Sequence, residues 1–334
     1  MVTISVCMIV KNEEDILARC LDSLEGIWDE LIIVDTGSSD NTKEIASKYT
    51  DKVYDFVWTG DFSEARNFAL SKATCEYIYS ADADEILDGI NHELFLSLKS
   101  CLDPAIDVVQ MYYGNQLEQG TVYNYDKELR PKLFKRVRPI QFIEPIHETL
   151  NIEPVIFDSE IVITHKPTSQ HGGRDIETFK RLIAQGDMLS HRLRSFLFRE
   201  LYMLGSMDDL MQLKEYLYLI TEADDSTTDE TLEACVLLAK YHRLCGEYIE
   251  MFNNVVKVVA MGSNSEICVE LGQYYLECGD PINASIWFYN AYHECEPVLS
   301  IKAGKEYALE GLVRCYEELG DTENAAFYRT FIEE

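Results

Sequence analysis

Two aspartates two positions apart, Asp82 and Asp84, stand where an apolar, β-prone segment ends, and Glu85 follows them directly. In a strand, side chains two positions apart share a face, so both carboxylates would point the same way. Such carboxylates repel each other unless a cation lies between them, and Mg²⁺ or Mn²⁺ binds through one or two carboxylates plus substrate phosphates. The small Ala83 would let a ligand approach the backbone. Equally, the triplet can be a set of surface charges capping a helix that begins near Ile86.

A second candidate is Asp35, which ends another apolar segment and opens a polar loop over residues 35–42. Its carboxylate can accept a hydrogen bond from a nucleobase N–H, or it can pair with a nearby arginine. Backbone N–H groups of this loop precede a predicted helix, a position suited to a diphosphate. Ser39 or Asp40 can instead cap that helix with no ligand involved, and residue types alone favour the cap.

A third candidate is Arg66, near the start of another predicted helix. Its guanidinium can meet a phosphate or a base. It can also form an ion pair with Glu64 or Asp61, and the residue types favour neither interpretation.

Alternating strands and helices must position these side chains. Apolar runs rich in β-branched residues predict buried strands, whereas an apolar stripe over residues 16–24 predicts a helix. Strand, helix, strand at this spacing indicates βαβ units, in which ligands bind beyond the carboxyl ends of the strands. Asn12, Asp35 and Asp82 fall at such ends and should converge. The predicted strands are residues 4–10, 31–34, 53–58 and the segment before Asp82; the intervening helices are residues 16–24, 42–48 and 63–73.

Four blocks of this region together resemble a family-2 glycosyltransferase of GT-A fold. They are Ser5 to Glu14, Ile33 to Asp40, Ala65 to Asn67 and Asp82 to Glu85, in the family's order and spacing, covering most of residues 3–90. The resemblance implies a Rossmann-like α/β domain that binds a nucleotide sugar. It implies that Asp82 and Asp84 hold Mn²⁺ or Mg²⁺ on the diphosphate and that a general base activates the acceptor for inversion. It further implies that the nucleotide sugar is contacted by Val10, Asn12, Glu13, Asp35, Arg66, Asp82 and Ala83.

Residues 90–168 resemble the family more loosely, with a strand predicted over residues 106–113. The pair His147 and Glu148 looks like the family's late active-site element, and either side chain can be the general base, Glu148 being slightly favoured. Glu144 stands where most members have glycine. A late histidine completes the metal shell in related enzymes, so His165 is a candidate third ligand, although a histidine at a strand end is more often structural. The basic segment 127–138 suits a diphosphate or an acidic acceptor, or is a solvated strand face with Leu133 and Phe134 in the core.

Composition limits the class of protein. The 334 residues carry a formal net charge of −30, which argues against a general nucleic-acid binder. The ten cysteines are irregularly spaced, which indicates a reducing compartment. Neither a signal peptide nor an apolar run long enough to span a membrane is evident, so a cytoplasmic location is predicted.

The second half is predicted to be an all-α solenoid resembling tetratricopeptide repeats. A domain boundary is predicted between residues 1–168 and 169–334, with residues 167–173 as a lid or a plain linker. Extra residues around 296–305 would lengthen a loop or helix, and a single capping helix is predicted over residues 307–332. The repeat pattern is carried by Leu271, Gly272, Tyr275, Gly279, Ala284, Phe288 and Ala291, with weaker units around Gly246 and Gly320.

These features predict a metal-dependent, inverting glycosyltransferase that uses a UDP-sugar, such as UDP-glucose or UDP-N-acetylglucosamine. Because solenoids present a concave face to peptides, the expected acceptor is a polypeptide side chain. The helices can equally brace the catalytic domain or form a homodimer. A lipid-linked or polysaccharide acceptor is the alternative within enzymes. A repeat-based adaptor that has lost catalysis is the alternative of another class.

Overall fold

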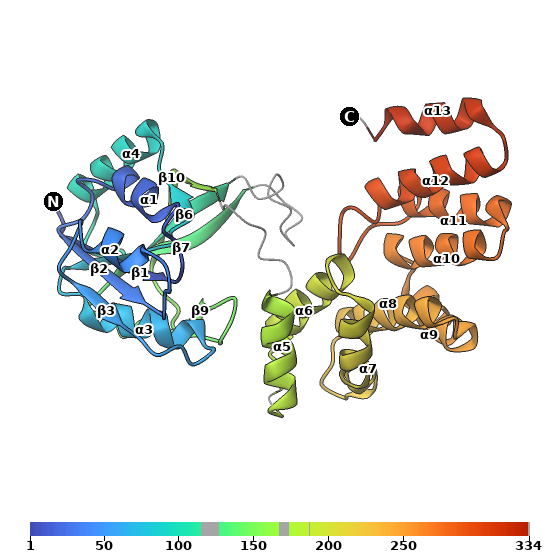
Figure 1. The fold of residues 1–334 in the computed structure, drawn as a ribbon, viewed down its shortest axis with the longest axis horizontal. Coiled ribbons are helices and arrows are strands. Elements are labelled where there is room, and N and C mark those ends of the chain that lie inside the picture. Colours follow the sequence, from blue (N-terminus) through green and yellow to red (C-terminus); the bar gives the residue numbers. More distant parts are fainter. Residues whose placement is uncertain (115–126, 167–173, 187, 333–334) are drawn as a thin grey trace. The chain divides into compact units, whose positions relative to one another are not determined.

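The computed structural model describes residues 1–114, 127–166, 174–186 and 188–332, and within them the chain forms two compact units, Met1–Gln170 and His171–Glu334 (Figure 1). The predicted boundary after residue 168 and the predicted lid or linker at 167–173 fall outside the described residues. Both therefore stay predictions.

The first unit is a mixed α/β domain around one sheet, whose described strands run in the order β3-β2-β1-β4-β7-β6-β10-β5. β3, β2, β1 and β4 are mutually parallel, which confirms the predicted βαβ arrangement. Bounds of this half are β1 (Ile4–Val10), α1 (Leu17–Ser23), β2 (Glu30–Asp35), α2 (Thr42–Ala46), β3 (Val53–Asp55), α3 (Phe62–Lys72) and β4 (Tyr77–Ala81). The third strand ends at Asp55, three residues earlier than expected.

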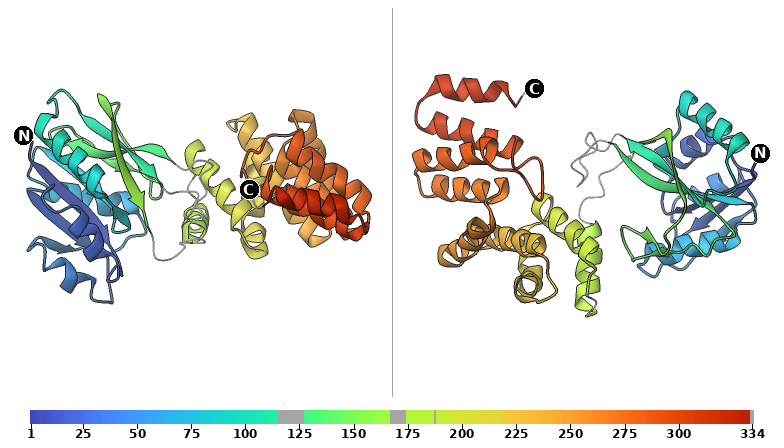
Figure 2. Two further views of the ribbon diagram at one scale, coloured as in Figure 1. Left: turned by 90° about the horizontal axis from the view of Figure 1, so that it is seen from above. Right: turned by 180° about the vertical axis from the view of Figure 1, so that it is seen from behind.

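Of the parallel strands, β1, β2 and β4 are buried on both faces because helices cover each side (Figures 1 and 2). Successive residues of β1 point to opposite layers: Val6 and Met8 pack in the cluster that includes Leu17 and Leu21 of α1, whereas Cys7 packs with Ala69 of α3. A continuous apolar run is therefore needed in each central strand.

The remaining elements of this unit bring distant segments to the same sheet. β7 lies antiparallel between β4 and β6, and β10 runs parallel to β6 and antiparallel to the short β5. Leu133 and Phe134 of β7 are buried, as the core interpretation of the basic segment predicted. The bounds are β5 (Glu85–Ile86), α4 (Gly89–Cys101), β6 (Val108–Gly114), β7 (Glu128–Lys135), β8 (Phe142–Ile143), β9 (Thr149–Leu150) and β10 (Ile156–His165).

The second unit is a series of packed helices, as predicted, in which α8 to α13 stack as successive antiparallel pairs (Figures 1 and 2). Gly246, Gly279 and Gly320, at φ 72°, 73° and 74°, terminate the first helix of three pairs in the left-handed conformation. Gly320 interrupts residues 307–332. The prediction of a single capping helix is therefore wrong, because this segment forms a pair of helices. The bounds are α5 (Arg174–Ala184), α6 (His191–Met203), α7 (Met207–Glu222), α8 (Thr228–Cys245), α9 (Tyr248–Met261), α10 (Ser265–Glu277), α11 (Pro281–His293), α12 (Glu306–Glu318) and α13 (Thr322–Thr330).

The extra residues between α11 and α12 form an extended loop held by one carboxylate. Glu266 is fully buried, and its oxygens accept hydrogen bonds from the backbone N–H groups of Val298, Leu299 and Ser300 at 2.7–3.1 Å. Burial raises the pKa of Glu266, and these hydrogen bonds oppose that rise. The insertion is thus anchored to α10.

Phe288 of α11 packs against a glycine on each of two neighbouring helices. A Cβ atom added to Gly272 of α10 would lie 2.7 Å from the Phe288 ring, and one added to Gly311 of α12 would lie 2.4 Å from it. Phe288 itself is fully buried. The two glycines therefore allow α10, α11 and α12 to approach one another around this ring.

Replacing Gly311 with alanine is expected to lower the free energy of unfolding of the helical unit by about 1–3 kcal/mol, because the added methyl group must displace Phe288. Better helix propensity, worth about 1 kcal/mol, acts in the opposite direction and is smaller. Chemical denaturation of the full chain checks this. Gly89→Ala is the matched control, since nothing lies within 4 Å of its added Cβ. Equal stability of Gly311→Ala and the unmodified chain would contradict the packing argument.

Candidate active site

The carboxyl ends of the parallel strands bring the predicted residues to one edge of the sheet. Val10 of β1 pairs with Asp35 of β2, and Met8 pairs with Ala81, the last residue of β4 before Asp82. Asn12, Asp35 and Asp82 therefore lie just beyond neighbouring strand ends. The sheet topology thus brings these three residues to the same edge, as predicted.

Asp35 is buried and organises the loop that follows it. Its Oδ1 accepts hydrogen bonds from the backbone N–H groups of Gly37 (3.0 Å) and Ser38 (2.9 Å), and Gly37 has φ 105°. Its Oδ2 is buried and has no hydrogen-bond partner among the described residues. Buried carboxylate oxygens are usually paired, so this atom is suited to accept an N–H from a ligand.

Asn12 joins this loop to the end of β1. Its backbone N–H donates to Ser38 Oγ (2.9 Å), and its Oδ1 accepts from the backbone N–H of Ser39 (2.8 Å). Asn12 has φ 57°, a left-handed conformation that asparagine tolerates. The carbonyl of Val10 accepts from the backbone N–H of Thr36 at 2.9 Å. These contacts make the N–H groups of Ser38 and Ser39 internal donors rather than a diphosphate cradle.

Glu13 and Asp40 complete the packing at the start of α2. The backbone N–H of Glu13 donates to Thr42 Oγ1 (2.7 Å), and Asp40 Oδ1 accepts from the backbone N–H of Thr42 (3.0 Å). Asp40 thus accepts the N–H of the first residue of α2, but the N-cap residue is Asn41, which makes no side-chain cap hydrogen bond, so the prediction that Ser39 or Asp40 is the cap is wrong.

Asp82 and Asp84 lie in the turn between β4 and β5, and Glu85 is the first residue of β5. β4 ends at Ala81, and the backbone N–H of Glu85 donates to the carbonyl of Asp82 at 3.1 Å. The expectation that Asp82 and Asp84 share one strand face is therefore wrong, because strand alternation stops before them. The alternative helix cap is also wrong, since α4 begins later and is capped by Asp88. Ala83, between the two aspartates, is buried.

Asp82 faces the helix and strand on either side of it. Its Oδ1 accepts from Arg66 Nη2 at 2.8 Å, and its Oδ2 lies 3.6 Å from Lys132 Nζ. Burial alone would raise the pKa of the Asp82 carboxyl, but these two cations outweigh it and hold the pKa well below its usual range. Asp82 is therefore ionised, and about a third of its side chain (32%) remains exposed for a further ligand.

Arg66 links Asp82 to a second carboxylate, that of Glu148. Arg66 Nε donates to Glu148 Oε1 at 3.0 Å, and Nη1 donates to Ser80 Oγ at 3.2 Å. Of the two interpretations left open for Arg66, the ion pair with Glu64 or Asp61 is wrong, since Arg66 pairs with Asp82 and Glu148, and Asp61 caps α3 by accepting from the backbone N–H of Glu64. Arg66 of α3 thus joins the end of β4, the turn after it and the loop that carries Glu148.

Asp84 points the other way, toward β10. His165 Nε2 lies 3.1 Å from Asp84 Oδ2, because β10 pairs with β5 in a register that places His165 opposite Glu85. Asp84 Oδ1 is buried and has no hydrogen-bond partner among the described residues. Carboxylate oxygens are the donors that Mg²⁺ and Mn²⁺ prefer, so Asp84 offers a ligand of the kind that the predicted cation needs, with the His165 imidazole beside it.

The structure adds two residues that were not predicted as part of the site. Lys132 and Glu85 are both buried, and Lys132 Nζ donates to Glu85 Oε1 at 2.7 Å. Burial raises the pKa of Glu85 to about 7, although Lys132 opposes that rise. The basic segment containing Lys132 and the acidic triplet containing Glu85 were both noticeable in the sequence, but their pairing was not, because it depends on β7 lying next to β4.

The pair His147 and Glu148 lies on a strained loop beside α3. Glu144 and His147 have φ 73° and 51°, and the carbonyl of Pro145 accepts from the backbone N–H of Phe62 at 2.9 Å. Glu148 is brought to Arg66, and thereby to Asp82, as described above. Either His147 or Glu148 remains a candidate for the general base.

Parts of this chain are similar to known proteins. Residues 5–147 match the family described as Glycosyl transferase family 2. A TPR repeat-containing protein of Synechococcus elongatus is 38% identical over 151 residues, which are 45% of this chain and 36% of that protein. The SPbeta prophage-derived glycosyltransferase SunS of Bacillus subtilis is 31% identical over 149 residues, 44% of this chain and 34% of that protein. The matches thus span about a third of the length of these curated relatives.

The lipopolysaccharide core biosynthesis glycosyltransferase LpsC of Rhizobium meliloti is 25% identical over 200 residues, 53% of this chain and 73% of that protein. Among solved structures, Staphylococcus aureus TarS in complex with UDP gives a TM-score of 0.40 at 17% identity, covering 85% of this chain and 90% of TarS. Glucosyl-3-phosphoglycerate synthase from Mycobacterium tuberculosis, in complex with Mn²⁺ and UDP-glucose, gives 0.40 at 17%, covering 57% and 81%.

The N-terminal part of the chain is a family-2 glycosyltransferase domain, and a region of packed helices follows it. The predicted family and fold class are thereby confirmed. Among the residues that the structure describes, no helix combines the length and the apolarity needed to span a bilayer.

Proposed function

We propose that this chain is a metal-dependent, inverting glycosyltransferase that transfers a sugar from a UDP-sugar, UDP-glucose or UDP-N-acetylglucosamine, to a polypeptide side chain. One observation carries the metal-dependent part. Asp84 places an unpartnered buried oxygen next to His165, at the strand edge where Asp82 and Asp35 also lie.

The site residues take the following roles in this proposal. Asp35 accepts an N–H of the base through its unpartnered Oδ2, and Asp82, Asp84 and His165 would hold Mn²⁺ or Mg²⁺. Such a cation, when bound, neutralises charge on the departing diphosphate. Arg66 lies beside the nucleotide and forms ion pairs with Asp82 and Glu148. Around the nucleotide sugar, Val10, Asn12, Glu13 and Ala83 supply backbone and small-side-chain contacts.

Glu148 or His147 takes the proton from the acceptor nucleophile. For this role the side chain must come within about 2.6–3.2 Å of that nucleophile. Glu148 is held by Arg66 at 3.0 Å, so its position is fixed before any acceptor arrives.

The polypeptide acceptor is supported by the helical unit, because stacked helix pairs form concave surfaces that bind peptides. A glycan or lipid-linked acceptor is the second candidate, and the similarity to LpsC favours it, since that relative is named for lipopolysaccharide core biosynthesis. The helical unit can additionally mediate a homodimer, which is compatible with either acceptor.

Thermal denaturation with nucleotide tests the donor part of this proposal. UDP with Mn²⁺, at about 100 times its Kd, is expected to add about 2.7 kcal/mol of stability and so to raise the melting temperature by about 5 °C or more. UDP with EDTA should produce little change, because the diphosphate lacks its counter-ion. GDP and dTDP with Mn²⁺ are the matched ligand controls.

No response to any nucleotide would instead favour the adaptor without catalysis. If the UDP response appears, donor hydrolysis across UDP-, GDP- and dTDP-sugars identifies the sugar. Intact-mass analysis of candidate peptides after reaction then tests the acceptor: a mass gain of one hexose or N-acetylhexosamine supports it. Transfer only to a glycan or lipid-linked acceptor would contradict the polypeptide part.

A further inference from the structure

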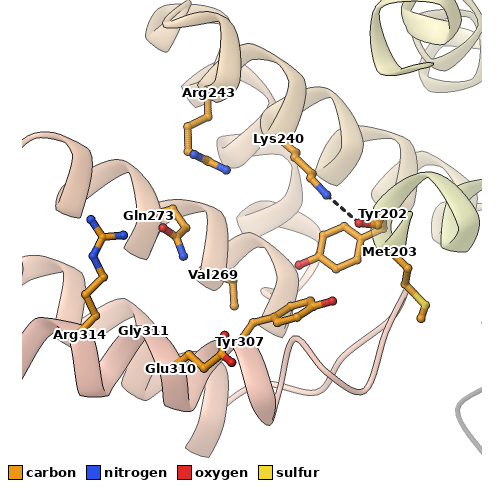
Figure 3. Close-up of a pocket in the computed structure, with 10 residues that line it drawn as sticks. All are labelled: Tyr202, Met203, Lys240, Arg243, Val269, Gln273, Tyr307, Glu310, Gly311 and Arg314. Carbon is orange, nitrogen blue, oxygen red and sulfur yellow. Dashed lines mark hydrogen bonds between the residues drawn. The ribbon is translucent and has the colours of Figure 1, made fainter. Parts of the chain in front are cut away.

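The helical unit contains a cavity of about 360 Å³, at the small end of the range for ligand pockets. Its walls come from the first helices of four successive pairs, α6, α8, α10 and α12 (Figure 3). The side chains relevant here are Tyr202, Lys240, Arg243, Gln273, Tyr307, Glu310 and Arg314. The volume suits one or two residues of a chain rather than a long segment.

Lys240 is the central cation of this cavity. Its Nζ donates to the backbone carbonyl of Tyr202 at 2.7 Å, the contact drawn in Figure 3, and lies 4.7 Å from the centre of the Tyr202 ring. Among the described residues, no carboxylate lies within ion-pair distance of it. Burial lowers the pKa of the Lys240 ammonium, although Glu270 opposes this. An anionic ligand would compensate a charge that the fold leaves uncompensated.

The other two cations that line the cavity, Arg243 and Arg314, differ from Lys240 because each forms an ion pair with a carboxylate. Arg243 is buried and forms ion pairs with Glu270, at 2.7 Å, and with Glu277. Arg314 is exposed at the opposite end of the cavity and pairs with Glu318 at 3.2 Å, a surface contact that costs little to exchange. Neutral donors complete the lining: the amide of Gln273 and the two tyrosine hydroxyls of residues 202 and 307.

Taken together, these groups offer several hydrogen-bond donors around one cation, with Glu310 as an exposed acceptor on α12. We infer that this cavity binds a single carboxylate of the polypeptide acceptor, either its chain terminus or one Asp or Glu side chain. Glu310 accepts a backbone N–H of the same peptide, a group that inorganic phosphate lacks. The net charge of −30 would repel an acidic run, so one carboxylate flanked by neutral residues fits best.

This inference rests on the proposed polypeptide acceptor, and peptide binding to the full chain tests it without donor or catalysis. The probe is a fluorescein-labelled pentapeptide pool with Gly, Ala, Ser and Leu mixed at each position. It is prepared with a free C-terminal carboxylate, with a C-terminal amide, and as the amide with one internal Asp. Fluorescence anisotropy is expected to show at least one carboxylate form binding at least tenfold more tightly than the neutral amide. Whichever carboxylate form binds identifies the source.

Lys240→Met is expected to remove that preference, whereas Lys257→Met, the loss of an exposed lysine on α9, should keep it. If Lys240→Met has an abnormal melting curve, Tyr307→Phe provides a second test. This variant deletes one hydroxyl and should weaken carboxylate binding about threefold or more, the loss of one hydrogen bond. Equal binding of all three peptide forms, or a preference unchanged by these variants, would overturn the inference. So would complete displacement of the acidic peptide by 1 mM inorganic phosphate, which would make this a general anion site.

The UDP and Mn²⁺ melting response is measured on the same protein. A normal response without carboxylate preference defeats only this inference. A carboxylate preference without any nucleotide response defeats the proposed transferase and leaves the peptide site standing.

Discussion

Asp84→Asn is expected to slow sugar release from the UDP-sugar donor by about a thousandfold while the fold persists. Asparagine keeps the shape of the side chain but removes the negative charge next to His165 that the proposed cation needs. The cation supplies several kcal/mol of transition-state stabilisation, and about 4 kcal/mol corresponds to a thousandfold change in rate. Because Asp84 Oδ1 has no hydrogen-bond partner among the described residues, few native contacts are lost.

Asp51→Asn is the matched control, since it removes the same charge from an exposed position of the same unit. UDP release is followed at saturating donor with Mn²⁺ titrated, and melting curves verify that each variant is folded. For Asp84→Asn the Mn²⁺ concentration needed for half-maximal stabilisation by UDP should also rise. Turnover within threefold of the unmodified chain would remove Asp84 from the metal site.

The fold was predictable because its signals are local. The run Ile4–Val10 is a strand over the predicted residues, and the apolar stripe that includes Leu17 and Leu21 is α1. Both patterns follow from burial, which dictates apolar residues at every position of a central parallel strand and on one side of a helix. The glycines at 246 and 279 likewise mark helix ends in the left-handed conformation, whereas the same signal at Gly320 was overlooked when residues 307–332 were expected to be one helix.

Candidate site residues could be named from the sequence, but the contacts among them could not be predicted. Asp82, Asp84 and His165 were proposed as a group, yet the strand alternation used to align the aspartates fails because β4 ends at Ala81. Asp84 approaches His165 instead through the pairing of β10 with β5, elements separated by some seventy residues. Neither segment has a sequence periodicity from which this strand register could be predicted.

The ion-pair partners of the buried charged residues could not be predicted from the sequence, for the same reason. The local alternatives for Arg66 were the neighbouring carboxylates of its own helix, because sequence spacing reveals only such pairs. The structure pairs it with Asp82 and Glu148, residues from a turn and a late loop. Lys132 was visible only as part of a basic segment, although it is buried against Glu85.

Arg66 is the residue on which the charge balance of this site depends most. Its side chain is 17% exposed and contacts two carboxylates, Glu148 at 13% and Asp82 at 32% exposure. Removing one partner of a buried ion pair costs about 3–5 kcal/mol, because an uncompensated charge remains. Arg66→Met is expected to cost about 3 kcal/mol, the lower end of this range, since Asp82 keeps part of its surface in water.

The loss should appear as a lower free energy of unfolding of the first unit in urea titrations, with Lys48→Met, an exposed charge deletion, near the unmodified value. The double variant Arg66→Met with Glu148→Gln separates charge from packing. If the stranded Glu148 carboxylate causes the loss, neutralising it should restore about 1 kcal/mol or more, a coupling of the size expected for residues in contact. A double variant no more stable than Arg66→Met would show that the guanidinium matters through its packing against Phe142, 5.7 Å from the ring centre, rather than through its charge.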